Sequence, residues 1–397
     1  MAKKKLRLGF TGAGFIAREH YKSIQKVSDV DVEVVGVYSR RFATAEKFAN
    51  EFGIKPYADL GALLDDIDVI DICSPPYAHA EGILEAAKRG VHIMCEKPFI
   101  GYSPQGDAAD FNGFTAPKEP MYEAIMQDSY RIQQALKSGG SNFCYFENLI
   151  YTPHIQKEKE ILQKTGAQIL RMMGEESTKG TTGVEYNLYW KTCCGGSLMG
   201  TGSHPLGTVI YLKKVEGMAR NNKPIRIASI SAHIHQLTQI PSFINKGFMR
   251  SEYYDTEDYA MAHIVFEDGT VADIFGATVV LGGINDYIDI YANNHRTRCN
   301  INPTQLMPVY NPGDPSFDNV FVNYGVSNHN GWLNICPDEN WMFGYDGEMF
   351  DALRCFANGT TPEADLQVAL DTGMALHAAY VSAERGGATV SLTPISL

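Results

Sequence analysis

The feature that most constrains this chain is a glycine-rich turn close to its start. Residues 6–10 have the apolar character of a short strand, and residues 16–27 carry apolar side chains at helical spacing. Gly12-x-Gly14-x-x-Ala17 lies between them. In this setting Gly12 permits a tight turn, Gly14 lets a diphosphate approach the backbone, and Ala17 allows helix and strand to pack closely. The pattern predicts a dinucleotide-binding turn whose anion lies at the N-terminus of the helix.

The second predicted strand, residues 32–38, ends in Ser39-Arg40-Arg41 rather than in an acidic residue. An acidic residue at such a strand end accepts a hydrogen bond from the ribose 2′-hydroxyl of NAD. A serine and two arginines suit a 2′-phosphate instead, although arginines also stack on adenine or face solvent. The sequence therefore leaves NAD and NADP open, with a slight preference for NADP.

Strands and helices alternate through the first hundred residues. Residues 67–73 form a buried apolar strand followed by Ser74-Pro75-Pro76, residues 80–90 form a helix, and residues 91–95 form a strand that ends in Glu96-Lys97-Pro98. This alternation predicts a doubly wound parallel sheet. A proline cannot continue a strand ladder, so Lys97 is expected at a strand end, where open parallel sheets bind their ligands.

The second half of the chain has a different pattern. Five strands are predicted, at residues 227–234, 259–266, 271–280, 287–291 and 297–301, and helices follow at 349–356 and 365–384. Such a series favours a large, open, mostly antiparallel sheet. Because 397 residues exceed the size of one core, we expect two α/β domains. We place the Rossmann domain at 1–142 and the substrate-binding and oligomerisation domain at 143–397, with the last helices packing back toward the first.

The composition of the chain limits the kinds of partner that it is expected to bind. The net charge of -12 and the lack of a long basic run beyond Lys3-Lys4-Lys5 argue against nucleic acid. No apolar run is long enough to span a membrane, and no signal peptide is predicted, so we expect a cytoplasmic protein. Eight cysteines show no Cys-x-x-Cys pair or metal-ligand spacing, and we expect buried thiols and no metal.

Three motifs together resemble a known family. The combination of Gly12-x-Gly14-x-x-Ala17, Ser74-Pro75-Pro76-x-x-His79 and Glu96-Lys97-Pro98 is similar to the Gfo/Idh/MocA family of glucose–fructose oxidoreductase, inositol dehydrogenase and rhizopine-catabolism proteins. The resemblance implies a Rossmann domain followed by an α/β domain whose open sheet carries a sugar site and subunit contacts. We therefore expect a homo-oligomer, a dimer or a tetramer.

The resemblance also implies roles for single residues. The lysine matching Lys97 contacts both the nicotinamide ribose and the reacting hydroxyl, and the glutamate matching Glu96 lies against the cofactor. The predicted contacts of NAD or NADP are Gly12, Gly14, Phe15, Ile16, Ser39, Arg40, Ser74, Pro75, His79, Glu96 and Lys97.

A second chemical centre is expected at residues 190–207, which resemble the family's glycine-rich helix start. There an aspartate and, one turn later, a histidine project toward the nicotinamide. His204 matches the histidine, but Gly200 stands where the aspartate is expected. His204 must then find another partner, or share proton transfer with the other candidate catalytic residues, which are Lys97, Glu175 and Tyr151.

Substrate contacts are expected from the start of the second domain. By resemblance, Glu147 and Asn148 contact the sugar, and Lys179 and Lys191 would bind an anionic sugar or remain solvated. Residues 101–120 form a glycine- and proline-rich loop longer than compact domains normally tolerate. We predict a lid over the substrate, with a passive or oligomer-contacting insertion as the alternative.

These residues permit three functions. The first is hydride transfer from a ring hydroxyl, expected at C3, of a sugar, glycoside or cyclitol to a nicotinamide. The second is redox-neutral glycoside hydrolysis with tightly bound NAD, through oxidation, elimination, hydration and re-reduction, on an anionic sugar such as sulfoquinovose. The third is a non-catalytic redox or ligand sensor, against which the retained Lys97 and His204 argue.

Overall fold

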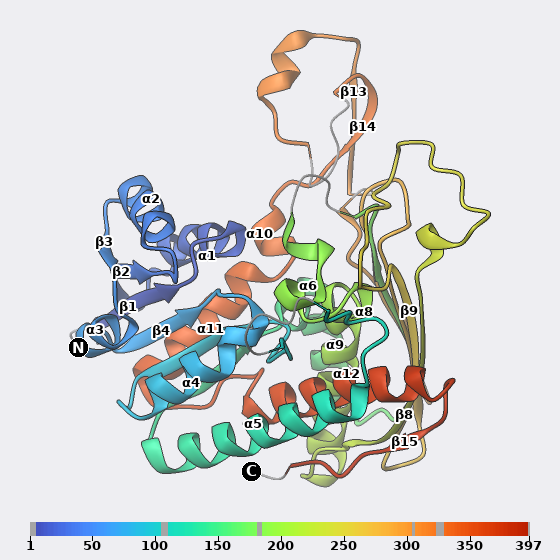
Figure 1. Cartoon of the computed structure of the whole chain (residues 1–397), viewed down its shortest axis with the longest axis horizontal. Helices are drawn as coiled ribbons and strands as arrows, with labels where there is room; N and C mark the ends of the chain where they lie inside the picture. The colour runs from blue at the N-terminus through green and yellow to red at the C-terminus, as the bar shows by residue number, and fades with distance from the viewer. Residues whose placement is uncertain (1–4, 105–109, 181–184, 304–305, 323–328, 396–397) are drawn as a thin grey trace.

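The computed structural model describes residues 5–104, 110–180, 185–303, 306–322 and 329–395. Two sheets lie side by side, each covered by helices, and a small hairpin projects from the body (Figure 1). This arrangement confirms the predicted class of a doubly wound parallel sheet followed by a second α/β domain.

The first sheet has six strands in the order β3-β2-β1-β4-β5-β6, with every neighbouring pair parallel. The strands are β1 (Lys5–Thr11), β2 (Asp31–Tyr38), β3 (Lys55–Tyr57), β4 (Val69–Ile72), β5 (His92–Glu96) and β6 (Phe143–Phe146). The connecting helices are α1 (Phe15–Lys26), α2 (Phe42–Phe52), α3 (Leu60–Asp66), α4 (His79–Ala87) and α5 (Lys118–Gly139). The strand at 143–146, which we expected to open the second domain, pairs with β5 and completes the first sheet. The predicted boundary at residue 142 is therefore too early.

The second sheet has seven strands in the order β12-β11-β7-β10-β9-β8-β15. They are β7 (Ile169–Ser177), β8 (Ile227–His235), β9 (Tyr259–Phe266), β10 (Val271–Ala277), β11 (Asn285–Ala292), β12 (Arg296–Asn300) and β15 (Val390–Ser391). β7 and β10 pair in parallel, whereas the other pairings are antiparallel. The helices of this half are α6 (Pro153–Thr165), α7 (Trp190–Cys193), α8 (Ser197–Gly200), α9 (Ser203–Asn221), α10 (Glu339–Met342), α11 (Tyr345–Asn358) and α12 (Leu366–Glu384).

Two C-terminal helices join the domains. α11 lies against α1, where the Ser23 hydroxyl donates to Asp346 Oδ1 at 2.7 Å. α12 lies between α5 and the second sheet and is buried on all sides, as expected of a helix whose sequence is apolar all round. His377 of this helix donates from Nε2 to the carbonyl of Ile100 at 3.2 Å. The segment that follows β5 is thus fixed from the second domain.

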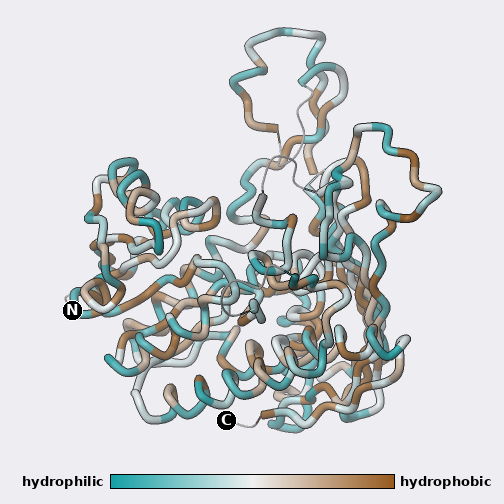
Figure 2. The backbone as a smooth tube through the Cα atoms, viewed as in Figure 1, coloured by the Kyte–Doolittle hydropathy of each residue, from teal (hydrophilic) through white to brown (hydrophobic). Residues whose placement is uncertain are grey.

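Apolar residues are concentrated where sheets and helices meet, and Figure 2 shows them as the brown parts of the strands in the body. β13 (Met307–Asn311) and β14 (Gly331–Ile335) form a hairpin apart from both sheets, with a small core of their own (Figure 1, top). Among the helices that the structure describes, none is long and apolar enough to cross a membrane.

Candidate active site

The geometry of the first sheet brings four loops together. β1, β4, β5 and β6 are neighbours and run in the same direction, so their carboxyl ends meet at one edge. The residues that follow these ends are Gly12, Cys73 and Ser74, Lys97, and Glu147. The chain order also reverses between β1 and β4, which is the position where open α/β sheets bind nucleotides.

The glycine turn fits a dinucleotide. Gly12 has a φ of +89°, and a Cβ built on it would lie 2.4 Å from the Cys73 carbonyl oxygen. A Cβ on Gly14 would meet no described atom within 4 Å, so the backbone there is open to a ligand. α1 begins at Phe15 with Gly14 as its N-cap and receives no side-chain cap. The first amides of α1 are therefore available to an anion such as a diphosphate.

Arg18 was not predicted as part of this turn. Its Nη1 donates to the carbonyls of Ala13 at 3.1 Å and Gly14 at 2.9 Å, while its Nε and Nη2 pair with Glu51. A guanidinium that holds two successive carbonyls fixes the outward direction of the neighbouring amides. The only sequence clue to this role of Arg18 is its position one helical turn after Gly14.

The other predicted cofactor contacts differ in how accessible their side chains are. Ser74 and Pro75 lie in the loop beside Gly12, and Ser39 and Arg40 follow β2 with partly buried and exposed side chains. His79 does not fit the prediction, because its side chain is completely buried. Its ring nitrogens contact the carbonyl oxygens of Ser74 at 2.6 Å and Phe99 at 3.0 Å. His79 braces two loops and cannot contact a cofactor directly.

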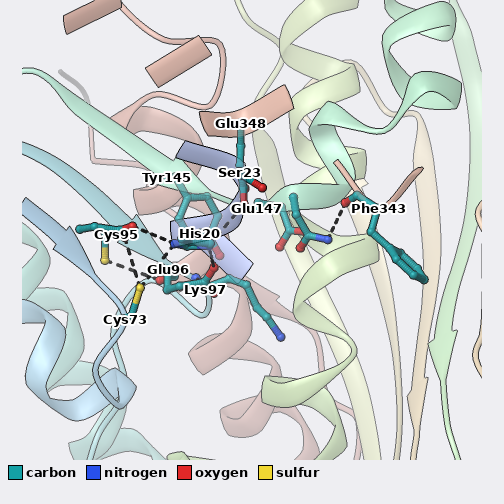
Figure 3. A network of polar contacts seen from close by, with 12 residues as sticks. His20, Ser23, Cys73, Cys95, Glu96, Lys97, Tyr145, Glu147, Phe343 and Glu348 are labelled. Atoms are coloured by element: carbon teal, nitrogen blue, oxygen red, sulfur yellow. Dashed lines mark hydrogen bonds and ion pairs between the residues drawn. The ribbon is translucent and has the colours of Figure 1, made fainter. Parts of the chain in front are cut away.

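Lys97 lies where the two domains meet. Its backbone N–H donates to Glu96 Oε2 at 3.0 Å, and its Nζ donates to the carbonyl oxygen of Gly200 at 2.9 Å. Figure 3 shows Glu96 and Lys97 next to a group of buried polar side chains that includes His20, Glu147 and Glu348. A Cβ on Gly200, where the family aspartate is expected, would meet no described atom within 4 Å. The main-chain carbonyl thus holds the ammonium at this position.

His204 has a carboxyl partner from another element. Its Nδ1 lies 2.6 Å from Glu147 Oε1, and its Nε2 lies 3.6 Å from Glu176 Oε2. Glu147 can approach because Gly207, one turn after His204 on α9, has no side chain: a Cβ there would lie 3.0 Å from Glu147 Cγ. Glu147, predicted as a sugar contact, therefore takes the place of the missing aspartate as the partner of His204.

Burial sets the protonation of this pair. It raises the pKa of Glu147 to about 8, against the opposing effect of the Lys97 ammonium. It lowers the pKa of His204 to about 4, an effect that Glu176 opposes and Lys97 reinforces. In the neutral range the imidazole is uncharged and the carboxyl carries a proton. Lys97 acts on both groups, so the amine and the imidazole belong to one site.

Two further carboxyl groups lie on the second sheet near the His204–Glu147 pair. Glu176 of β7 and Asp286 of β11 are directly paired across the strands, so their side chains lie on the same face of the sheet. Burial raises the pKa of both. Neither carboxyl oxygen of Asp286 has a hydrogen-bond partner among the described residues, and its side chain is buried. This face of the sheet offers acceptors that the protein itself leaves unused.

Three predicted residues do not reach this cluster. Glu175 is one position from Glu176 on β7 and therefore points to the opposite face, where it is paired with Tyr287. The Tyr151 hydroxyl donates to Asp351 Oδ2 at 2.8 Å and accepts from the Ala364 N–H at 3.1 Å. Asn148 donates from Nδ2 to the Phe343 carbonyl at 2.8 Å. The structure gives Tyr151 and Asn148 structural contacts rather than contacts with a ligand.

Lys179 and Lys191, predicted to bind an anionic sugar or to remain solvated, are not part of the described contacts of this cluster. Lys191 is exposed, with its Nζ 5.2 Å from the centre of the Tyr189 ring, and no described contact joins Lys179 to His204 or Lys97. Part of this segment, residues 181–184, lies outside the described residues, as do residues 105–109 of the predicted lid. The rest of the 101–120 loop contacts the second domain, where Trp190 Nε1 donates to the Tyr102 carbonyl at 3.1 Å. Its role as a lid remains a prediction.

The fold is therefore a Rossmann sheet with a dinucleotide-type turn, followed by a second α/β domain that brings His204 toward the same edge. Residues 6–107 match the model of the Gfo/Idh/MocA oxidoreductase family, described as an NAD-binding Rossmann fold. This match agrees with the predicted family resemblance and with the predicted nicotinamide cofactor, and it covers residues 6–107 of the 397.

Two relatives with a named activity match about a quarter of the chain. Glucose-6-phosphate 3-dehydrogenase of Bacillus subtilis is 35% identical over 92 residues, which cover 23% of this chain and 26% of that protein. D-glucoside 3-dehydrogenase of Escherichia coli is 35% identical over 101 residues, which cover 25% of this chain and 28% of that protein. The matched stretches thus span about a quarter of each relative.

The similarity in fold extends over the whole chain. The structure of GenD2 from gentamicin A biosynthesis, solved with NAD, superposes with a TM-score of 0.75 at 17% sequence identity and covers 98% of this chain and 97% of that one. At this identity the likeness establishes the arrangement of both domains and nothing about the substrate.

Proposed function

We propose that this protein is a dehydrogenase that removes hydride from a ring hydroxyl of a neutral sugar, glycoside or cyclitol. The observation that carries this proposal is the joint position of Lys97 and the His204–Glu147 pair at the edge that also holds the glycine turn. A bound nicotinamide would supply the hydride acceptor.

The chain's own residues would handle the proton. Lys97 donates a hydrogen bond to the hydroxyl oxygen and favours its deprotonation, since an ammonium stabilises developing negative charge. His204 is neutral in the neutral range, and the His204–Glu147 pair can accept the proton once Glu147 has lost its own. Glu147 lies 2.6 Å from the other ring nitrogen, so it fixes the ring and shares the proton.

The charges around His204 favour a neutral substrate. Glu147, Glu176 and Asp286 are hydrogen-bond acceptors when ionised, and the hydroxyl groups of a polyol are donors. An anionic sugar would have to lie among these carboxyl groups, whose pKa values burial raises and whose ionised forms would repel it. Lys179 and Lys191 have no described contact with these groups. We therefore do not extend the proposal to an anionic sugar such as sulfoquinovose. The expectation that C3 is oxidised has support from the names of the two 3-dehydrogenase relatives.

One experiment separates the candidate functions. Purified protein is mixed with NAD or NADP and a panel of neutral sugars, cyclitols and aryl glycosides, while reduced nicotinamide and free aglycone are both measured. Accumulation of reduced nicotinamide supports the proposal, and the position of the new ketone tests C3. Release of aglycone without reduced nicotinamide would identify the redox-neutral hydrolase instead. If the protein binds the cofactor but forms neither product, the non-catalytic sensor is the remaining candidate function.

A further inference from the structure

A second buried histidine lies behind Lys97, on the side of the Rossmann sheet (Figure 3). His20 is on α1, the helix that begins at the dinucleotide turn, and its side chain is completely buried. The three acidic side chains around it are Asp71 of β4, Glu96 of β5 and Glu348 of α11. The sequence gives no local reason for a histidine at this position, and the proposed proton transfer does not use it.

Both ring nitrogens of His20 face carboxyl oxygens. Nδ1 lies 2.9 Å from Asp71 Oδ2, while Nε2 lies 3.1 Å from Glu96 Oε1 and 3.6 Å from Glu348 Oε1. The Nδ1 contact is a hydrogen bond, and the Nε2 contacts are ion pairs without aligned hydrogen-bond geometry. An imidazolium, with a proton on each nitrogen, would be attracted to Asp71 on one side and to Glu96 on the other. Burial raises the pKa of Glu348 well above its usual value, so this third acid is not counted as a carboxylate.

Glu96 transmits this contact to Lys97. One of its oxygens lies at His20 Nε2, and the other accepts the backbone N–H of Lys97 at 3.0 Å. Glu96 is buried, with one oxygen hydrogen-bonded to the Lys97 backbone and the other at ion-pair distance from His20, which limits its rotation. A continuous set of polar contacts therefore leads from the dinucleotide helix, through His20 and Glu96, to the backbone of the residue that carries the amine.

We propose that His20 is a positioning residue: its imidazolium fixes Glu96, and Glu96 fixes the backbone of Lys97 so that the amine is correctly placed for the hydroxyl. This inference rests on the proposed function for its effect on catalysis, but its effect on Lys97 is independent of any substrate. Small displacements of a reacting group cost about 10²-fold in rate, so loss of the imidazolium should lower kcat on that scale.

The first test measures amide hydrogen exchange in the segment that contains Lys97. In His20→Gln, with and without NADH, the Lys97 amide should exchange at least about tenfold faster, while amides of β9 in the second sheet should change much less. His263→Gln is the matched control, because His263 also pairs with a carboxylate, Asp273 Oδ1 at 2.7 Å, but on the second sheet. If single substitution prevents folding, His20→Gln/Asp71→Asn removes the unpaired Asp71 charge and still leaves Glu96 without its partner.

The second test is a kinetic double-mutant cycle with Glu96→Gln, using the sugar found in the panel. His20→Gln should lower kcat with less than about threefold change in KM, and Glu96→Gln should add little to it, because both act through one contact. Unchanged Lys97 exchange, or losses in kcat that multiply, would overturn the inference. So would a stoichiometric metal ion bound to His20 in the purified protein. If no sugar is oxidised by the wild type, the proposed function fails, while the exchange experiment still decides the role of His20.

Discussion

Two buried histidines lie on either side of Lys97, and their charge states differ. Burial by itself would lower the pKa of His20, but Asp71 and Cys73 outweigh it, so the pKa is raised well above 6.5. Burial also lowers the pKa of His204, to about 4, and there Lys97 adds to the decrease while Glu176 opposes it. The same residue type is thus a fixed cation in one cluster and a neutral proton acceptor in the other.

The difference comes from the neighbours of each ring. His20 is enclosed by acidic groups of the Rossmann sheet and α11, whereas His204 shares its surroundings with an ammonium. A cation enclosed by carboxylates supplies rigidity and does not titrate near neutrality. An uncharged ring beside a protonated carboxyl can exchange a proton. We infer that the first cluster positions Lys97 and the second performs proton transfer.

Lys97 lies between the clusters, so its removal should have the largest effect. Lys97→Ala should reduce kcat about a thousandfold, within the range for loss of an acid–base group, while the Kd of NADH changes little. Steady-state kinetics and a fluorescence titration with NADH check this. A near-normal kcat would remove Lys97 from the mechanism and make the His20 contacts purely structural.

The two histidines should differ in what they contribute to stability. His20→Gln leaves buried carboxylates without their cation and should lower the free energy of unfolding by about 3–5 kcal/mol. His204→Gln removes an uncharged hydrogen-bonding group and should cost about 1 kcal/mol, although it should abolish most activity. Urea unfolding at pH 7, with His263→Gln as the control, measures both. Equal losses would contradict the assigned charge states.

The pH dependence of kcat should reflect only the His204–Glu147 pair. Because burial raises the pKa of Glu147 to about 8, its proton is present below that pH and must leave before the pair can accept another. Sugar oxidation should therefore accelerate as the pH rises through about 8, and ketone reduction should slow. Glu147→Gln cannot ionise and should lose this dependence, as pH profiles of kcat in both directions will show. If Glu147→Gln keeps the pH dependence of kcat, a group other than Glu147 is responsible for it.

The smallest effect is expected where the family aspartate is missing. Gly200 is exposed and a Cβ there meets no described atom within 4 Å, so Gly200→Asp should change the free energy of unfolding by less than about 0.5 kcal/mol. The new carboxylate would lie near Lys97 and should change kcat by less than about tenfold. Gly200→Ala is the control for the side chain alone. A large loss of activity in Gly200→Ala would show that the backbone, not the missing charge, matters there.

The sequence was informative where chemistry depends on local motifs. The glycine turn, Lys97 at a strand end and His204 at a helix start all follow from patterns within a few residues, and the structure brings them to one edge. The sequence predicts Glu175 as a catalytic candidate, whereas its neighbour Glu176 lies beside His204. A shift of one residue reverses the face of a strand, and no pattern in residues 175–183 fixes that register.

Partners that come from distant elements could not be predicted. The sequence predicts Tyr151 as a proton carrier, but its hydroxyl donates to Asp351, 200 residues away in sequence. The same holds for Glu147 beside His204 and for His20 beside Glu96, whose pairings depend on the packing of separate elements. Gly207 was the one local clue to Glu147, since a missing side chain on the histidine face of α9 makes room for a neighbour.

The hydrogen bond from Lys97 Nζ to the Gly200 carbonyl has a further consequence for ligand recognition. The amine is already engaged before any alcohol arrives, so an incoming oxygen gains the difference between two hydrogen bonds and not the value of a whole one. The affinity of the site for the uncharged alcohol is therefore expected to be weak. An alkoxide carries a full negative charge and would compete far better than the alcohol with the Gly200 carbonyl oxygen for the Lys97 ammonium. The ammonium therefore binds the deprotonated form of the substrate more tightly than the alcohol.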